Sequence, residues 1–414
     1  MRSPCKSIFR IIGLFLLAAW LPTWAADEAP TYVPGRLLAA HRPGIDANLL
    51  DRTLKLHGAA VRKHWPEISL SVLDVPEASA GAIMESLQRT GLFEYVERDQ
   101  YAHTAETPND PAFVSQWYLT KLQSPQAWNV TTGSTAVVVA VIDTGVYGAH
   151  PDLTSQLVTG WNFVNSTSDT SDRLGHGTGV AGTIAAASNN GIGVAGVSWQ
   201  SRIMPLVVVD EKDFAAYSNI AEAIRYAADR GVRVINISIG GSGESATLQA
   251  AVDYAWSKGA LIFASAMNNG TSTPYYPAAC NHAIAVSATD GDDHLASFSN
   301  YGNWIAIAAP GTNILTTTSG GGYGYLFGTS FSSPIVAGVA ALALAINPSL
   351  TNAQVVSLLE RTADDIGAPG YDTSFGWGRV NAFHAVATAM QEALIGEKQP
   401  LVPMPIFPRR NRVP

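Results

Sequence analysis

Apolar runs and helical patterns alternate along the chain from Trp117 onward. The apolar runs, rich in β-branched residues, are 136–142, 233–239, 260–264, 283–288 and 305–308, and the helical patterns are 178–187, 219–230, 245–258 and 330–346. Runs that are apolar on both faces are typical of parallel strands covered by helices on each side. The alternation predicts a three-layer α/β domain, whose active site lies beyond the carboxyl ends of the strands. Two final helices are expected at 351–361 and 380–390.

The earlier part of the chain, residues 31–104, has a different pattern. It predicts strands at 37–39, 69–75 and 93–97 and helices at 46–57 and 78–89. The order β-α-β-α-β indicates a small α+β sandwich that precedes the larger domain. The polar segment 104–111 then reads as a linker, the kind of segment where proteolytic cleavage concentrates.

The N-terminus has the pattern of a secretory signal peptide, predicted to cover residues 1–26. Basic residues precede an apolar stretch at 11–21, and Ala25 and Ala26 offer a cleavage position. The stretch is shorter than the roughly 20 residues that cross a bilayer, so an uncleaved anchor is the weaker alternative. We therefore expect a secreted protein, extracellular or periplasmic, that has no membrane attachment after signal removal. The tail at 392–414, rich in proline and arginine, is expected to be disordered.

Composition narrows the possible partners and the possible cross-links. The chain has 414 residues, of which 47% are hydrophobic and 14% charged, with a formal net charge of −8. An acidic balance disfavours nucleic acid and anionic membranes as partners. Because Cys5 lies in the signal peptide, Cys280 is alone in the processed chain and no intramolecular disulfide is possible. A lone cysteine is either a nucleophile or, as the flanking Pro-Ala-Ala favours here, a small buried hydrophobe.

Three short segments, each containing glycine, carry the candidate chemistry. They read VIDTG at 141–145, GHGTG at 175–179 and GTSFSSP at 328–334, and they centre on Asp143, His176 and Ser330. In this order they resemble the subtilisin-type serine proteases, thermitase-like members in particular. The resemblance covers about residues 110–390, and a weaker resemblance to the inhibitory propeptides of that family covers 31–104. It implies a propeptide at 27–106 and a subtilisin-like peptidase domain at 107–391.

A serine hydroxyl is a weak nucleophile at neutral pH and needs an adjacent base. His176 can accept the proton of Ser330, and a buried Asp143 would fix the tautomer of His176 and stabilise the imidazolium that forms. The resemblance assigns the oxyanion formed during attack to two donors, the backbone N–H of Ser330 and the side-chain amide of Asn268. Asn269 is the alternative amide, because Met267 stands where the family usually has glycine.

The resemblance also implies a substrate cleft that binds the peptide as an added strand. Ser238, Ile239 and Gly240 would line one wall of the first specificity pocket, and the opposite wall would consist of Ala264, Ser265 and Ala266. Because both walls are apolar and uncharged, we expect a hydrophobic or aromatic residue before the scissile bond. Side chains at 213–215, where the family is usually glycine-rich, would narrow the range of substrates.

Calcium is the structural ion that the resemblance implies, and no catalytic cofactor is expected. Calcium takes six to eight oxygen ligands, including carboxylates and backbone carbonyls. The match assigns carboxylates to Asp110 and Asp152 and the amide oxygen to Asn190, with backbone carbonyls from Ser188, Ile192 and Val194. The alternative is an ordinary turn with unrelated acids.

Two literal motif matches are rejected on context. Residues 191–196 fit G-x-G-x-x-G, but a dinucleotide site needs a strand before it and a helix after it. Here a helical pattern precedes the glycines and the strand-like run 203–209 follows them. The segment around Ser330 lacks the second glycine of the G-x-S-x-G elbow, and no H-E-x-x-H or C-x-x-C occurs, so neither an α/β-hydrolase nor catalytic zinc is indicated.

These observations together predict a secreted serine endopeptidase, made as a self-processing zymogen, that acts through an acyl-enzyme. Its partners would be protein or peptide substrates and its own propeptide as an intramolecular inhibitor, and it would act as a monomer. Two alternatives stay open: a catalytically silent binding protein with the same fold, and a peptide ligase that uses the same acyl-enzyme.

Overall fold

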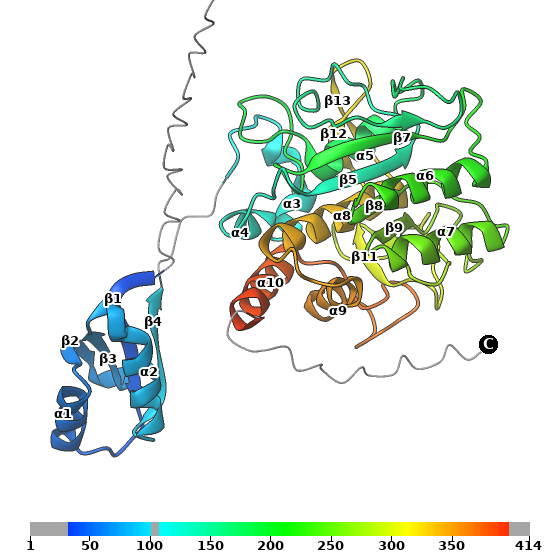
Figure 1. The fold of residues 1–414 in the computed structure, drawn as a ribbon. Helices are drawn as coiled ribbons and strands as arrows, with labels where there is room; N and C mark the ends of the chain where they lie inside the picture. The colour runs from blue at the N-terminus through cyan, green and yellow to red at the C-terminus, as the bar shows by residue number, and fades with distance from the viewer. Residues whose placement is uncertain (1–31, 101–106, 397–414) are drawn as a thin grey trace, which may run out of the picture. The chain divides into compact units, whose positions relative to one another are not determined.

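The computed structural model describes residues 32–100 and 107–396 (Figure 1). The chain divides into two compact units, Met1–His103 and Thr104–Pro414. The expected signal peptide, residues 104–106 of the expected linker and the tail beyond 396 lie outside the described residues.

The described part of the first unit is a four-stranded antiparallel sheet in the order β2-β3-β1-β4, with two α-helices. Its elements are β1 Tyr32–His41, α1 Ala47–Leu56, β2 Ala60–Trp65, η1 Pro66–Ile68, β3 Leu70–Asp74, η2 Glu77–Ser79, α2 Ala80–Arg89 and β4 Phe93–Gln100. The α+β class is confirmed, but the predicted order β-α-β-α-β is wrong because β2 is an additional strand. Its side chains are almost all exposed, so it has no apolar alternation that sequence analysis could detect.

Within residues 107–396, seven strands form a parallel sheet in the order β11-β10-β9-β8-β5-β7-β6. The strands are β5 Val138–Asp143, β6 Trp161–Asn162, β7 Arg202–Val207, β8 Val234–Ile237, β9 Leu261–Ser265, β10 Ala283–Thr289 and β11 Ile307–Pro310. Five of them were predicted as apolar runs and β7 as the strand-like run 203–209. The short edge strand β6 has only two residues and no recognisable pattern.

The sheet is covered by helices on both faces, as predicted (Figure 1). Val139 and Val141 of β5 pack in one core with α5 His176–Ala185 and α8 Thr329–Ile346. Ala140 and Ile142 belong to the other core, with α6 Tyr217–Asp229 and α7 Ala246–Ser257. Because successive strand residues point to opposite faces, the central strands are apolar at most positions on both faces.

The remaining elements surround this three-layer centre. They are η3 Phe113–Ser115, α3 Trp117–Lys121, α4 Ser124–Trp128, the hairpin β12 Ile314–Thr317 and β13 Tyr323–Leu326, α9 Asn352–Thr362 and α10 Ala382–Gly396. Helix α10 runs past residue 391, where the peptidase domain was expected to end. In the described residues, α8 alone is long and apolar enough to cross a membrane, and 89% of its apolar window is buried inside the second unit.

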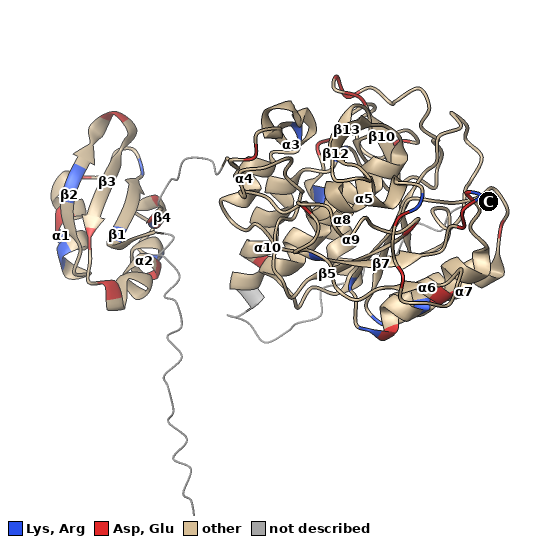
Figure 2. Ribbon diagram, turned by 90° about the horizontal axis from the view of Figure 1, so that it is seen from above, with Lys and Arg blue, Asp and Glu red and all other residues tan. Residues whose placement is uncertain are grey.

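Charged side chains are sparse and scattered over both units (Figure 2). The lone cysteine of the described chain, Cys280, is buried in the core that contains α6 and α7. Burial raises the pKa of its thiol to about 12. A thiol with so high a pKa is a poor nucleophile at neutral pH, which agrees with the prediction of a small buried hydrophobe.

Candidate active site

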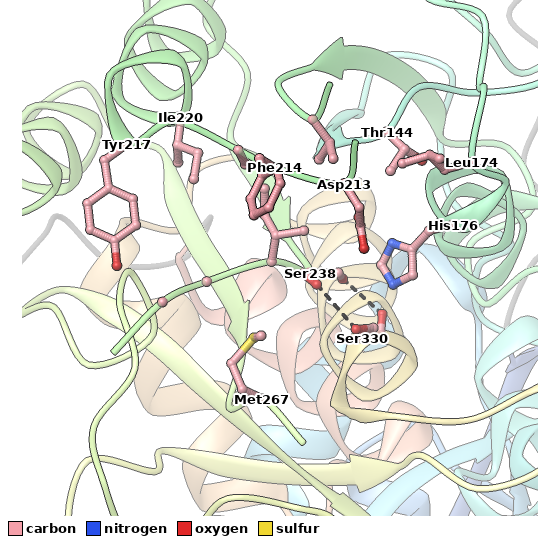
Figure 3. A pocket seen from close by; sticks show the side chains of 15 residues that line it. Thr144, Leu174, His176, Asp213, Phe214, Tyr217, Ile220, Ser238, Met267 and Ser330 are labelled. Carbon is pink, nitrogen blue, oxygen red and sulfur yellow. Dashed lines mark hydrogen bonds between the residues drawn. The ribbon is translucent and has the colours of Figure 1, made fainter. Parts of the chain in front are cut away.

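The segments around the candidate chemistry meet at the carboxyl edge of the parallel sheet. Asp143 is the last residue of β5, His176 the first residue of α5, and Ser330 the second residue of α8. His176 and Ser330 line the same pocket, of about 650 Å³ (Figure 3). The connections of a parallel sheet bring these distant segments to one edge.

Asp143 and His176 form a short hydrogen bond. The Nδ1 atom of His176 lies 2.7 Å from Oδ1 of Asp143, whose side chain is fully buried, whereas the imidazole is 33% exposed. The backbone N–H of Thr144 donates to the same carboxylate oxygen at 2.8 Å. Because Nδ1 is engaged by the carboxylate, the Nε2 atom is the one left to act in the pocket.

The pKa of His176 lies above its ordinary value. Burial of the ring lowers the pKa, but the negative charge of Asp143 and the hydrogen bond to it more than offset that effect. The carboxylates of Asp172 and Asp213 raise the pKa further. Within the described chain the Oδ2 atom of Asp143 is buried without a hydrogen-bond partner, so little else neutralises the charge that faces the imidazole.

Asp172 is a site residue that sequence analysis missed. Its Oδ1 atom accepts hydrogen bonds from the Thr144 hydroxyl at 2.8 Å and from the Gly175 N–H at 2.7 Å. Its Oδ2 atom accepts from the N–H of Thr178 at 2.8 Å, within the first turn of α5. An acid just before a predicted helix can cap it, and that signal was available in the sequence. The carboxylate thereby ties the turn after Asp143 to the start of the helix that carries the histidine.

Ser330 is nearly buried and makes reciprocal contacts with Ser238. The Ser330 hydroxyl donates to the Ser238 carbonyl at 3.2 Å, and the Ser238 hydroxyl donates to the Ser330 carbonyl at 2.8 Å. Figure 3 shows the imidazole of His176 beside the Ser330 hydroxyl. In the described residues no hydrogen bond joins the two, so the expected serine–histidine contact is not formed in this state. Such contacts are often long before substrate binds.

Asn268 lies next to the start of α8. Its Oδ1 atom accepts hydrogen bonds from the N–H and from the hydroxyl of Thr329, both at 2.9 Å. These donors fix the orientation of the amide and leave its NH₂ group for an outside acceptor. The alternative residue, Asn269, donates its backbone N–H to Asn300 instead. The Asn268 amide is therefore held beside the residue that precedes Ser330, whereas the contact given for Asn269 involves only its backbone.

The pocket differs from the expected specificity site on one side. Ser238, Ile239 and Gly240 line it, as expected. The residues expected opposite them are buried at the end of β9 and in the residue that follows, and they are absent from the lining: Ala264, Ser265 and Ala266. Met267 lines the pocket on that side. The side-chain direction of this residue was not readable from the sequence.

The loop at 188–194 wraps around two buried carboxylates. The N–H of Asn189 donates to Asp110 at 2.7 Å, and the N–H of Val194 donates to Asp152 at 3.2 Å. Burial raises the pKa of Asp110, and the neighbouring charge of Asp152 adds to this effect. Of the ion pairs in the described chain, none joins either carboxylate to lysine or arginine.

This donor set fits a hard divalent cation, because two buried carboxylates without a basic partner need a compensating charge. In the described part of the chain no group of three or more His, Cys, Asp or Glu could hold a metal, but calcium also accepts carbonyl and amide oxygens. Asn190 differs from the expectation. Its Nδ2 atom donates to Asp152 at 2.9 Å, while its Oδ1 atom accepts from the Ile192 N–H. To act as a ligand, the amide must turn its oxygen toward the carboxylates. The Ser188 hydroxyl donates to the Ala186 carbonyl and not to Asp110 or Asp152.

Comparison with known proteins identifies both units. The profile of the subtilase family matches residues 134–378, and that of the fervidolysin N-terminal prodomain matches residues 23–99. The chain is 39% identical over 362 residues to the thermophilic serine proteinase of Bacillus sp. (strain AK1), covering 87% of this chain and 89% of that protein. It is 44% identical over 281 residues to thermitase of Thermoactinomyces vulgaris, covering 68% of this chain and 99% of that protein.

A solved protease structure from Pseudoalteromonas arctica PAMC 21717 superposes with a TM-score of 0.63 at 36% identity, covering 69% of this chain and all of that one. The solved structure of a lanthipeptide protease gives the same TM-score at 27% identity. The chain belongs to the subtilase family, and it is a subtilisin-like serine protease that carries an N-terminal prodomain.

Proposed function

We propose that this protein is a secreted, self-processing zymogen of an endopeptidase that hydrolyses peptide bonds through an acyl-enzyme on Ser330. The observation that carries the proposal is the 2.7 Å hydrogen bond between His176 and the buried Asp143, with Ser330 in the same pocket. A carboxylate, an imidazole and a hydroxyl in this arrangement are the components of serine-type nucleophilic catalysis.

In the proposed reaction the Ser330 hydroxyl turns from the Ser238 carbonyl toward Nε2 of His176, which takes its proton as Ser330 attacks the substrate carbonyl. Asp143 holds the tautomer and stabilises the imidazolium, which then protonates the leaving amine. The backbone N–H of Ser330 and the amide NH₂ of Asn268 stabilise the oxyanion. Water, activated by the same imidazole, releases the acyl group. No step uses a catalytic cofactor.

Calcium is proposed as a structural ion, held by Asp110, Asp152 and the turned amide oxygen of Asn190. The loop would add carbonyl oxygens from Ser188, Ile192 and Val194, which gives the mostly oxygen environment that calcium prefers. When bound, the ion would compensate the negative charges of the two carboxylates and fix the loop that follows α5.

The prodomain is proposed to inhibit the protease until the chain cleaves itself within 104–109. The mature enzyme would act as a monomer on protein or peptide substrates, outside the cytoplasm. A domain whose sheet pairs strands distant in sequence folds slowly, so a folding template in the same chain is of use.

Mass spectrometry of the secreted full-length chain tests the proposal. The wild type should lose the prodomain, the Ser330→Ala variant should retain it, and an organophosphate should label Ser330 alone. Ser332→Ala is the matched control, because Ser332 lies on the same helix and its buried hydroxyl contacts the Pro310 carbonyl. Processing of Ser330→Ala at the wild-type rate would overturn self-processing, and absence of the label would support a silent binding protein. Product analysis with amine acceptors separates hydrolysis from ligation.

A further inference from the structure

Met267 has an unusual backbone conformation at the edge of the pocket. Its φ angle is +74°, in the left-handed region that glycine adopts freely and that other residues rarely adopt. Strain of this kind persists only where the surroundings enforce it, and it concentrates at ligand-binding sites. The conformation therefore indicates that the Met267 side chain has a role at the pocket.

The turn that holds Met267 is fixed by other residues. The N–H of Asn300 donates to the Met267 carbonyl at 3.0 Å, and Oδ1 of the buried Asn300 accepts from the N–H groups of Asn269 and Thr271. None of these contacts involves the methionine side chain. The backbone of the turn should thus keep its shape when the thioether is removed.

The thioether lies between the end of β9 and the pocket wall that carries Gly240. The Sδ atom lies 3.6 Å from the hydroxyl of Ser265, at the end of β9. It also lies 3.5 Å from the position that a Cβ atom on Gly240 would occupy, on the opposite wall. Figure 3 shows the Met267 side chain directed toward the segment that carries Ser238. A side chain in this position occupies space beside Gly240 that a large substrate side chain would need.

We propose that Met267 fills the part of the cleft between Gly240 and the end of β9, where the first specificity pocket is expected, so that the protease prefers a small side chain directly before the scissile bond. This inference rests on the proposed function and specifies the substrate class of the same site. It replaces the hydrophobic or aromatic preference that the apolar walls suggested. Large aromatic side chains enter only when the flexible methionine turns aside, which costs binding energy in the transition state.

The test uses two peptide substrates that differ only at the residue before the scissile bond, alanine or phenylalanine. The processed wild type should cleave the alanine peptide with the higher kcat/KM. Met267→Gly and Met267→Ala should each raise the phenylalanine-to-alanine ratio of kcat/KM by about 10-fold or more, the range expected for reshaping an apolar pocket. Because the ratio compares two substrates of one enzyme, any common effect on the neighbouring Asn268 cancels.

Met267→Leu is the matched control, because it retains a bulky side chain and should leave the ratio within about threefold of the wild type. A wild type that prefers phenylalanine, or a ratio that Met267→Gly and Met267→Ala leave unchanged, would overturn the inference. Should the variants fail to mature, the wild type can be used to digest a denatured protein. The residues found directly before its cleavage sites then show whether it prefers small side chains there. Failure of the proposed function is distinguishable, because then no peptide is cleaved and no organophosphate labels Ser330.

Discussion

Gly177 offers a direct test of how the start of α5 positions His176 against Asp143. A Cβ atom at this position would lie 2.2 Å from the Gly145 carbonyl oxygen and 3.1 Å from the Cβ atom of Asp143. Carbon and oxygen normally approach to about 3.3 Å, so in Gly177→Ala the two segments must separate by about 1 Å. His176 precedes Gly177 and moves with it, so its 2.7 Å hydrogen bond to Asp143 should lengthen.

A displacement of about 1 Å at reacting groups can cost on the order of 10² in rate. We therefore expect kcat of Gly177→Ala to fall about 100-fold. KM should change little, because Gly177 is not among the residues that line the pocket. Overpacking should also lower the free energy of unfolding by about 1–3 kcal/mol. The assay is hydrolysis of a chromogenic peptide by the processed enzyme at a titrated active-site concentration, with denaturant unfolding for stability and the rate of self-processing as a second readout.

Gly338→Ala in α8 is the matched control. A Cβ atom there would lie 2.7 Å from the Cβ atom of Val197, so the variant is also overpacked, but the added atom meets neither Asp143 nor His176. It should lose similar stability and keep kcat within about threefold. Wild-type kcat in Gly177→Ala, or equal losses of kcat in the two variants, would refute the reasoning that close packing at the helix start positions His176.

Three further predictions follow from the described site. A chelator should lower the thermal unfolding midpoint of the wild type, and Asp152→Asn should abolish that response. Calcium at 100 times its Kd would stabilise the folded state by about 2.7 kcal/mol, and a midpoint that the chelator leaves unchanged contradicts structural calcium. The kcat/KM should fall as the pH drops through the raised pKa of His176, because only the neutral imidazole accepts the proton. Removal of the nearby negative charge in Asp213→Asn should lower the pKa of His176 and move the acid side of the kcat/KM pH profile to lower pH, with a smaller shift at high salt. An unchanged pH profile excludes the charge interaction between Asp213 and His176. The residue after Ser330 is Phe331, which peroxide cannot convert to a sulfoxide. Activity on a peptide with a small residue before the scissile bond should therefore survive dilute peroxide, and rapid inactivation would count against this.

The sequence predicted the centre of the fold well because burial there leaves a clear pattern. Strands such as β5 are covered on both faces, so every position before Asp143 is apolar and the run is easy to detect. The strand β2 of the first unit was missed for the opposite reason, since nearly all its side chains are exposed and strand pairing through backbone groups leaves no hydrophobic signal. The hairpin of β12 and β13 was likewise too short to distinguish from a loop.

At the site, sequence analysis identified groups but not contacts. Asp143, His176 and Ser330 are recognisable by their flanking glycines, whereas the link from Asp172 to Thr144 depends on two segments that only the folded chain brings together. Met267 was noticed as a departure from the family pattern. Its consequence depends on the left-handed backbone, which aims the side chain across the pocket and has no signature in residue type.

The hydrogen bonds of Thr144 hold Asp143 and the start of α5 together without any contribution from Met267. The backbone N–H of Thr144 donates to Asp143, its hydroxyl donates to Asp172, and the same hydroxyl accepts from the N–H of Gly177. One turn thus connects both carboxylates to the start of the helix that carries His176. Met267 makes none of these contacts, so its substitution can reshape what the pocket admits while the carboxylate–imidazole pair keeps its geometry.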